Sequence, residues 1–447
     1  MAVRYKPYPQ YKDSGVEWLG VIPSTWPIAR MDDLAATIKD QITPKELESK
    51  VVIHYSIPTV QEIGIGRAEE GDTIDSNKFI VAAGDVLFSK LNPRKQTIST
   101  VASHAQMAVA STEFVVLRPI TQGQKYLHYM LHSKELNSFV CSQVESATKS
   151  HQRINPSVIS KLKFALPPEN ERLSISNFLD HETAKIDNLI EKQQQLIQLL
   201  KEKRQAVISH AVTKGLDPNA KLRDSGVEWL GEVPEHWEVK QAKYIADITR
   251  GAILRPVDAP EYFDDEGEWA YLNISDATAC DKYLFKSKLR LSVLGSTKSA
   301  RVYPGNVIIT ASATIGKAFI NKIKVCIHDG FIPFCNLKID NGYLYHYLSN
   351  PFLYAAMGKS NTQKNIYLDE VKNMLVTVPP SCEQLEIVKQ IEFSSMQFNS
   401  LLGKAENAIR LMQERRTALI SAAVTGKIDL RDWIAPQTSQ TNKEVAA

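Results

Sequence analysis

The sequence predicts an α+β fold in which two tandem strand-rich units, each with small helices, are separated by two long helices. These helices are expected to pair as an antiparallel coiled coil with approximate two-fold symmetry. Three observations predict this fold: an eight-residue segment that occurs twice, a β-rich middle in each half, and a long apolar heptad pattern at the end of each half. The expected boundaries are 1–168 for the first unit, 169–213 for the first long helix, 214–380 for the second unit, 381–426 for the second long helix and 427–447 for a tail.

The internal repeat is the most informative feature. Residues 13–20, Asp-Ser-Gly-Val-Glu-Trp-Leu-Gly, recur unchanged at 224–231. Eight consecutive identities that include tryptophan are not a chance event, so the chain consists of two copies of one unit. Further matches keep nearly the same spacing: Pro23 with Pro234, Trp26 with Trp237, Pro167-Pro168 with Pro379-Pro380, and 204–213 with 416–425.

The middle of each half predicts β-strands. Residues 84–89 and 305–310 both place β-branched and aromatic residues directly after a turn glycine, which is typical of a strand. Apart from such strands the two middles diverge strongly. Shared ends and different middles indicate one scaffold built twice, with different contacts in each copy.

The segments after Pro168 and Pro380 predict the long helices. From Ile175, alternating steps of four and three residues visit mostly apolar positions, and the same steps from Ile387 do so again. Polar residues fall at the same steps in both, which favours pairing of the two helices with each other. The expected interface is Ile175, Leu179, Ile186, Leu189, Leu196, Leu200, Val207, Ile387, Ile391, Phe398, Leu401, Met412 and Leu419.

The alternative is that each helix packs only on its own unit. A helix of about 40 residues is about 60 Å long, however, and exceeds the face of a domain of about 150 residues. Pairing is therefore the preferred interpretation.

Composition excludes several classes of protein. The chain has 447 residues, of which 43% are hydrophobic and 23% charged, an ordinary globular balance. No run approaches the roughly 20 apolar residues of a membrane span, and the first residues lack the pattern of a signal peptide. Five scattered cysteines form no Cys-x-x-Cys pair, so no metal site, no disulfide framework and a cytoplasmic location are expected.

Charge is distributed unevenly, although the net charge is only +3. Residues 282–328 contain nine Lys and Arg residues and no acid, and 86–112 and 146–168 are also free of acids. Each window alone is compatible with a solvated surface of strands and loops. Three in one chain favour a surface that faces phosphates.

Three segments carry a family resemblance. Residues 224–237 join the repeated motif to Val-Pro-Glu-His-Trp, 379–384 read Pro-Pro-Ser-Cys-Glu-Gln, and 419–429 read Leu-Ile-Ser-Ala-Ala-Val-Thr-Gly-Lys-Ile-Asp. These motifs resemble those of the specificity subunits of type I restriction-modification systems, and the resemblance extends over residues 8–432. The first half departs slightly, with Val-Ile-Pro-Ser-Thr-Trp at 21–26 and no Gln after 167–171.

The resemblance implies that each half is a target recognition domain that reads one part of a split, asymmetric site in double-stranded DNA. The paired helices would fix the unread spacer. Two modification (methyltransferase) subunits would methylate adenine N6 with S-adenosylmethionine, and two restriction subunits would use ATP with magnesium. The chain itself would hold no cofactor and would not contact a membrane.

Two places in each half are candidates for reading DNA. The first is the loop after the glycine-led strand, at 89–96 and 310–317, and the second is the polar stretch at 148–153 and 360–365. Their side chains have the donor and acceptor patterns that phosphates and base edges require, although each residue is equally compatible with an ordinary surface loop. The candidates, with two basic residues from the acid-free window, are Lys90, Asn92, Arg94, Lys95, Lys149, Gln152, Arg153, Lys298, Arg301, Ser312, Thr314, Lys317, Asn361, Gln363 and Lys364.

The repeated aromatic residues are expected to be structural. Residues that read different half-sites should differ between the two halves of the chain. Tryptophan, in contrast, occurs at both positions of each repeated pair, Trp18 with Trp229 and Trp26 with Trp237. We expect these tryptophans to pack in the shared scaffold or to form a docking surface for the modification subunit. Histidines in matching helical segments, such as His128 and His346, are expected to pack.

No catalytic motif is present in the sequence. The strings at 92–95 and 155–158 lack the second proline and the aromatic residue of the Asn/Asp-Pro-Pro-aromatic motif of adenine methyltransferases. The glycine pattern of a P-loop fails around Gly316-Lys317 and around Gly358-Lys359. The expected function is therefore non-catalytic DNA binding; the alternatives are a coiled-coil scaffold without DNA contact and a DNA-binding repressor that acts without partners.

Overall fold

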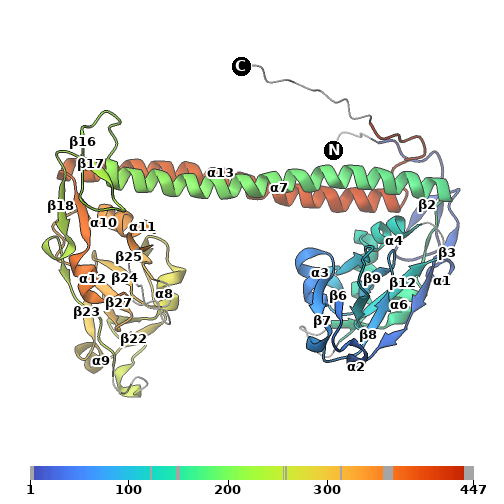
Figure 1. Ribbon diagram of the computed structural model, residues 1–447, viewed down its shortest axis with the longest axis horizontal. Coiled ribbons are helices and arrows are strands. Elements are labelled where there is room, and N and C mark those ends of the chain that lie inside the picture. Colours follow the sequence, from blue (N-terminus) through green and yellow to red (C-terminus); the bar gives the residue numbers. More distant parts are fainter. Residues whose placement is uncertain are drawn as a thin grey trace. The chain divides into compact units, whose positions relative to one another are not determined.

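The computed structural model describes residues 5–120, 123–146, 152–254, 256, 259–312, 315–355 and 366–436. The chain divides into two compact units (Figure 1). Unit 1 consists of residues 1–194 and 406–447, and unit 2 of residues 195–405. Both long helices contribute to both units: α7 is Glu169–Lys214 and α13 is Ser381–Val424. The sequence-based boundaries place the starts of these helices at the same two residues.

Unit 1 contains a four-stranded sheet in the order β10-β9-β12-β4 and a five-stranded sheet in the order β5-β8-β11-β6-β7. Neighbouring strands are antiparallel except for the parallel pair β6 and β11. The strands are β1 Tyr11–Asp13, β2 Val21–Pro23, β3 Ile28–Arg30, β4 Ala35–Ile38, β5 Gln41–Ile42, β6 Val51–Tyr55, β7 Arg67–Glu70, β8 Lys78–Val81, β9 Val86–Ser89, β10 Ile98–Thr100, β11 Ala108–Ser111, β12 Phe114–Pro119, β13 Val144–Ser146, β14 Gln152–Ile154 and β15 Lys163–Ala165. The helices are α1 Met31–Leu34, α2 Pro44–Leu47, α3 Ile57–Ile63, α4 Gln124–Leu131, α5 Lys134–Ser142 and α6 Pro156–Ser160, and the short 3₁₀ helices are η1 Gly71–Thr73 and η2 Pro93–Lys95.

Unit 2 also contains one five-stranded and one four-stranded sheet, in the orders β19-β27-β24-β25-β21 and β22-β20-β26-β23. The strands are β16 Leu222–Asp224, β17 Glu232–Pro234, β18 Glu238–Gln241, β19 Asp247–Ile248, β20 Trp269–Leu272, β21 Tyr283–Leu284, β22 Leu289–Leu291, β23 Ala300–Val302, β24 Val307–Thr310, β25 Ala318–Asn321, β26 Val325–Ile327, β27 Phe331–Cys335 and β28 Leu375–Val378. The helices are α8 Ile274–Ala279, α9 Val293–Thr297, α10 Asn341–Leu348, α11 Phe352–Ala355 and α12 Leu368–Asn373, and the 3₁₀ helices are η3 Ala242–Tyr244 and η4 Pro260–Tyr262.

The repeated eight-residue segment forms the same loop in both units. It joins β1 to β2 in unit 1 and β16 to β17 in unit 2. In each loop the aspartate side chain accepts a hydrogen bond from the glycine two residues later, at 3.0 Å from Gly15 and 2.9 Å from Gly226. These glycines have φ angles of 64° and 70°, a region that other residues rarely adopt. The loop conformation therefore explains the glycine of the motif.

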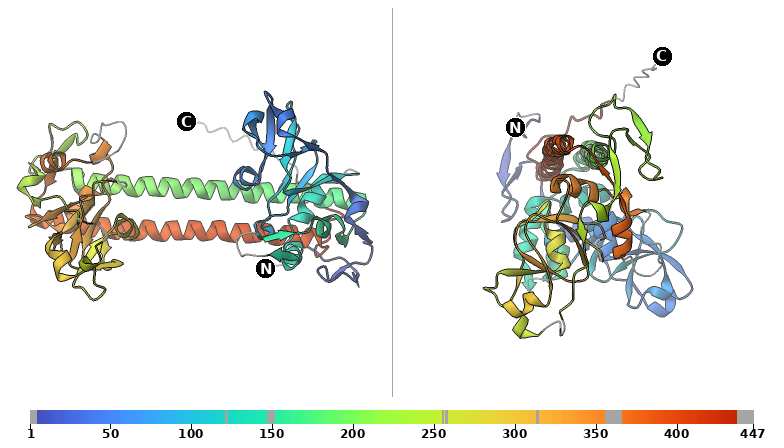
Figure 2. Two further views of the ribbon diagram at one scale, coloured as in Figure 1. Left: turned by 90° about the horizontal axis from the view of Figure 1, so that it is seen from below. Right: turned by 90° about the vertical axis from the view of Figure 1, so that its left-hand side faces the viewer.

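The long helices run antiparallel within each unit (Figure 2). In unit 1 the first turns of α7 and the last turns of α13 share one hydrophobic core, and Arg416 Nε donates to Asp187 Oδ1 at 3.0 Å. In unit 2 the last turns of α7 and the first turns of α13 share another core, and Arg204 Nη1 donates to Asn399 Oδ1 at 3.0 Å. Both members of the second pair lie 212 positions from their counterparts in the first pair, so the repeat extends to the contacts between the helices. The predicted pairing of the helices is confirmed.

Three of the predicted interface residues are wrong. The side chains of Leu189, Leu196 and Leu401 are 51%, 42% and 46% exposed, whereas the neighbouring Ile190, Ile197 and Leu402 are less exposed. The heptad pattern advances 3.5 residues per turn, whereas an α-helix has 3.6, so a strict heptad rotates away from the true interface by about 20° per repeat. Of the other predicted residues, Ile175, Leu179, Ile186, Ile387 and Ile391 are buried and Leu200, Val207, Phe398, Met412 and Leu419 are half-buried.

The repeated tryptophans anchor the start of each long helix. Trp26 Nε1 donates to Glu171 at 2.5 Å, and Trp237 Nε1 donates to Glu383 at 2.8 Å. Both indole rings are buried. The packing role predicted for this pair is confirmed. No helix among the described residues has the length and apolar character needed to cross a membrane.

Candidate nucleic-acid interface

The first predicted reading place in unit 1 is a tightly closed loop after β9. Its ends are joined by the Ser89 amide, which donates to Thr97 O at 3.0 Å, and the Ser89 hydroxyl accepts from the Leu91 amide at 3.1 Å. Asn92 and Gln96, on either side of η2, have left-handed φ angles of 46° and 47°. Non-glycine residues in this conformation carry strain, which is often stored at functional sites. The loop therefore has a defined shape.

The second predicted reading place contacts this loop directly. The Asn92 amide donates to Gln152 O at 2.8 Å, and the Ile154 amide donates to Lys90 O at 3.1 Å. Leu91 and Arg153 form an antiparallel bridge. Residues about 60 positions apart in the chain thus form one surface in unit 1. Lys149, another candidate in this stretch, lies outside the described residues.

The four candidate cations on this surface have different surroundings. Arg153 Nη2 donates to Glu113 Oε1 at 2.7 Å, and Lys95 Nζ donates to Gln61 at 3.2 Å. Burial lowers the pKa of Lys90, and the nearby Glu113 partly opposes this effect. Arg94 is exposed and makes no side-chain hydrogen bond or ion pair with the part of unit 1 that the structure describes. Of the four, Arg94 is the cation best placed for an external ligand.

Unit 2 forms the corresponding loop after β24. The Gly316 amide donates to Thr310 O at 3.0 Å, and the Lys317 amide donates to the Thr310 hydroxyl at 3.1 Å. The Ile366 amide donates to Ala311 O at 3.0 Å, as that of Ile154 does to Lys90 in unit 1. Both units therefore join the loop to the segment before the last small helix. Among the candidates, Ser312 and Lys317 lie in this loop, whereas Thr314, Asn361, Gln363 and Lys364 lie outside the described residues.

The basic window of unit 2 is largely engaged within the unit. Arg301 donates from Nε and Nη2 to Ser296, both at 2.8 Å, and its guanidinium lies 5.1 Å from the centre of the Trp269 ring. Lys298 lies 5.6 Å from the Tyr262 ring. Cation–π contacts of this kind stabilise the fold itself.

Acids from outside the sequence window neutralise part of this surface. Lys324 pairs with Glu268, and Lys282 pairs with Glu392 at 2.5 Å. A count of charges along the sequence cannot detect such partners, because they are brought together only by the fold. The rings of Trp269 and Tyr262, which lie against basic residues of this window, were also missed; residues 256–281 contain no lysine or arginine, so only the fold brings these rings beside the basic side chains.

The helical histidines pack, as predicted. His128 contacts the Thr100 hydroxyl at 3.0 Å, and burial, then Arg416, lowers its pKa to about 4. Burial, then Lys282 and Arg204, lowers the pKa of His346 to about 3. Among the described residues no group of three or more His, Cys, Asp or Glu side chains is arranged to hold a metal ion.

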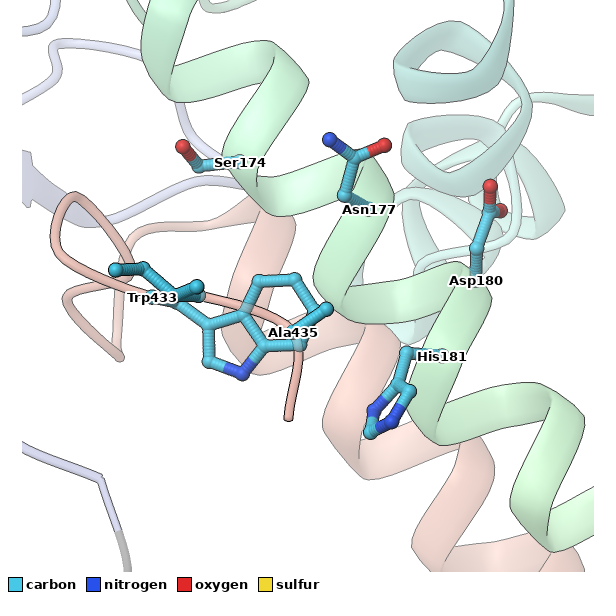
Figure 3. A pocket seen from close by; sticks show the side chains of 7 residues that line it. Ser174, Asn177, Asp180, His181, Trp433 and Ala435 are labelled. Atoms are coloured by element: carbon cyan, nitrogen blue, oxygen red, sulfur yellow. The ribbon is translucent and has the colours of Figure 1, made fainter. Parts of the chain in front are cut away.

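A cavity of about 620 Å³ lies beside α7 in unit 1 (Figure 3). Ser174, Asn177, Asp180 and His181 face it from successive turns of α7, and Trp433 lies against the same helix. The ring of Trp433 packs edge-on against Phe178, at 5.5 Å between centroids. The cavity therefore belongs to the scaffold and not to the loops that carry the reading candidates.

Comparisons with known proteins agree with this arrangement. The family model described as "Type I restriction modification DNA specificity domain" matches twice, at residues 23–201 and 234–402. The putative type I restriction enzyme MjaX specificity subunit of Methanocaldococcus jannaschii is 24% identical over 434 residues, which cover 92% of this chain and 96% of that protein. The MjaVIII specificity subunit of the same organism is 22% identical over 52% of each chain.

Two solved structures share the fold. One, from work titled as the structural basis of complex assembly and conformational transition of the type I restriction-modification system, has a TM-score of 0.68 at 18% identity and covers 91% of this chain and 99% of its own. The crystal structure of the HsdS subunit from Thermoanaerobacter tengcongensis has a TM-score of 0.52 at 17% identity and covers 91% and 98%.

Proposed function

The chain belongs to the family of type I restriction-modification DNA specificity proteins, and from this premise we propose that it is the non-catalytic DNA-reading subunit of such a complex. Each unit reads one half of a bipartite, asymmetric site in double-stranded DNA. Two methyltransferase subunits methylate adenine N6 with S-adenosylmethionine, and two restriction subunits cleave with ATP and magnesium. The complex acts in the cytoplasm, where bacterial and archaeal DNA lies.

The observation that carries this proposal is the convergence of the two reading places. In unit 1 the loop after the glycine-led strand pairs through backbone hydrogen bonds with the segment that contains Gln152 and Arg153, and in unit 2 the corresponding loop accepts one from Ile366, the residue that follows the polar stretch 360–365. The backbone arrangement is shared, but the side chains differ, with Lys90 and Arg94 in unit 1 and Ser312 and Lys317 in unit 2. A common scaffold with different side chains suits two different half-sites.

Exposed leucines at matching positions of the two long helices support the binding of two copies of one partner. Leu173, Leu189 and Leu199 of α7 are exposed, and so are Leu385, Leu401 and Leu411 of α13, which stand 212 positions later. Exposed apolar side chains at matching positions favour protein contact. Each unit carries three of these leucines, so each offers a similar docking surface to a methyltransferase subunit.

The decisive experiment maps N6-methyladenine in the genome of cells that express the chain with its methyltransferase partner. We expect one bipartite motif with a fixed spacer. Arg94→Ala should relax only the half-site that unit 1 reads, since a bidentate contact with guanine contributes about 1–3 kcal/mol of discrimination. Arg67→Ala, an exposed arginine of unit 1 that pairs with Glu62, is the matched control. Methylation without sequence preference would refute the proposal.

The docking surface has its own test. The double variant Leu189→Ser, Leu401→Ser should weaken binding of both methyltransferase subunits, and each single variant should weaken the binding of one. Leu196→Ser is the control, because its counterpart, Ala408, is not a leucine. Mass photometry of the purified complexes would count the bound subunits. Equal binding by all variants would exclude this surface.

A further inference from the structure

A second cavity in unit 1, of about 320 Å³, lies where the start of α4 meets the first turns of α7. It is lined by Gly123, Gln124, Lys125, Arg172, Leu173, Ser176 and Asn177. Arg172 is only 8% exposed, yet its Nε and Nη1 atoms have no hydrogen-bond acceptor among the described residues. A buried guanidinium without acceptors is costly, so this side chain calls for an external partner.

The equivalent residue of unit 2 has hydrogen-bond partners of a kind that Arg172 lacks among the described residues. Gln384 of unit 2 stands 212 positions after Arg172 and is equally buried. Its Nε2 donates to Pro379 O, and its Oε1 accepts from the Asp340 amide, both at 2.8 Å. Gln384 is therefore fully paired at a position where Arg172 is not.

The start of the neighbouring helix differs in the same way. Tyr343 of α10 and Tyr126 of α4 are equivalent, since their hydroxyls donate to Val212 O and Val424 O. Asp340, which precedes α10, accepts from the Tyr343 amide at 2.9 Å. The residue before α4 is Gly123, and no side chain caps this helix. At these two equivalent positions unit 1 has Gly123 and Arg172, and so neither the carboxylate nor the amide oxygen that unit 2 provides there.

Two acids that adjoin the lining residues, Glu171 next to Arg172 in the chain and Asp180 paired with Lys125, are already engaged. Glu171 accepts from Trp26 and Tyr8, and Asp180 accepts from Lys125 and Tyr129. The amides of Gln124, Lys125 and Tyr126 have no acceptor in the part of unit 1 that the structure describes, and they and the positive end of the α4 dipole lie at the same cavity as Arg172, which favours a negative ligand.

We propose that this cavity binds an oxyanion, either a free phosphate or a protein carboxylate, which accepts hydrogen bonds from Arg172 and from the first amides of α4. The ligand takes the place that the Asp340 carboxylate occupies in unit 2. At the equivalent described positions of unit 2 this place is filled by Asp340 and Gln384, so the site distinguishes two otherwise similar units. The proposal is independent of DNA reading.

The test uses the full chain with inorganic phosphate and with acetate, at an ionic strength matched with chloride. Isothermal titration should detect binding of at least one anion, and hydrogen exchange of the Gln124–Tyr126 amides should slow. A preference for phosphate would identify a free anion as the ligand, and a preference for acetate a protein carboxylate. If neither anion bound better than chloride, the proposal would be overturned.

Three variants make the test specific. Arg172→Gln installs the residue of unit 2 and should weaken anion binding at least about tenfold, as expected for loss of a charge-assisted hydrogen bond. Gly123→Asp restores the missing acid at a residue with an extended φ of −178°; it should raise the melting temperature and abolish the response to anions. Arg410→Gln, on the exposed part of α13, should change nothing. Equal anion binding by Arg172→Gln and the parent chain would also overturn the proposal.

Discussion

At the scale of single residues, Glu113 limits the positive charge of the reading surface in unit 1. Its Oε1 atom accepts from Arg153, and its Oε2 atom is buried with no hydrogen-bond partner among the residues that the structure describes. In the proposed function, incoming DNA competes with this acid for Arg153. The surface is less basic than its sequence indicates.

Glu113→Gln should strengthen DNA binding by the assembled complex several-fold, because it removes a negative charge beside Lys90 and Arg153. The slope of log affinity against log salt should become steeper by up to about one unit, as expected when one more phosphate contact forms. Fluorescence anisotropy over a salt series measures both. Glu62→Gln, an exposed acid of the same unit, is the control; weaker binding by Glu113→Gln would contradict the competition.

A buried histidine makes unit 2 sensitive to acid. His346 is buried, its Nε2 has no partner in the described part of unit 2, and burial lowers its pKa to about 3, whereas an unfolded histidine titrates near 6.5. Below about pH 6.5 the unfolded chain binds a proton that the folded chain does not bind. Stability must therefore fall as the pH drops from about 6.5 toward 3.

His346→Gln removes this contribution. Between pH 7 and pH 5 the variant should lose about 2 kcal/mol less free energy of unfolding than the parent chain. Urea denaturation followed by tryptophan fluorescence at both pH values measures the difference. His210→Gln, at an exposed histidine of α7, should lose as much as the parent; the same loss in His346→Gln would show that burial of this imidazole is not the cause.

At the scale of elements, the interface between the long helices follows the 3.6-residue period. Ile186 lies on it and is buried, whereas Leu196 is exposed. Ile186→Ala should destabilise the chain by about 2–4 kcal/mol through loss of buried surface and the cavity left behind. Leu196→Ala should change stability by less than about 1 kcal/mol. Denaturant unfolding compares the stabilities of the two variants. Equal losses of stability would support the heptad pattern, with Leu196 at the helix interface, instead.

Local sequence pattern predicts part of this fold. The repeat, the strands after Gly84 and Gly305, and the starts of both long helices follow from local pattern. The contact between the loop at Asn92 and Gln152 does not follow from local pattern, because it depends on hydrogen bonds between segments far apart in the chain. The ion pairs of Arg153 with Glu113 and of Lys324 with Glu268 cannot be predicted from local pattern either, since no sequence window contains both partners.

At the scale of the whole molecule, unit 1 is assembled from both ends of the described chain. The Asp429 amide donates to Lys6 O at 2.7 Å, and the Tyr11 hydroxyl donates to Gly426 O at 3.0 Å. Gly426 also lies against Pro23 and Trp26, as Gly215 lies against Pro234 and Trp237 in unit 2. In unit 2 this contact joins segments that follow one another in the chain, whereas in unit 1 it joins segments about 400 residues apart.

This difference predicts an unequal response to truncation. A chain that ends at Thr425 loses the buried Leu430, the contact of Trp433 with Phe178 and the hydrogen bonds of Gly426 and Asp429. Burial of one large apolar side chain contributes about 1.5–3 kcal/mol, so unit 1 should lose about 3 kcal/mol or more. Hydrogen exchange should rise across 8–30 and in α4, with no change in β24 or α10 of unit 2.

A chain that ends at Pro436 keeps all of these contacts and is the matched control, with exchange equal to that of the full chain. If the chain ending at Thr425 exposed both units equally, the two units would unfold as one cooperative body. If it exposed neither, the contacts of residues 426–433 would contribute little to the stability of unit 1. Only a selective loss in unit 1 agrees with a unit that depends on both ends of the chain, because unit 2 takes all of its residues from the continuous segment 195–405.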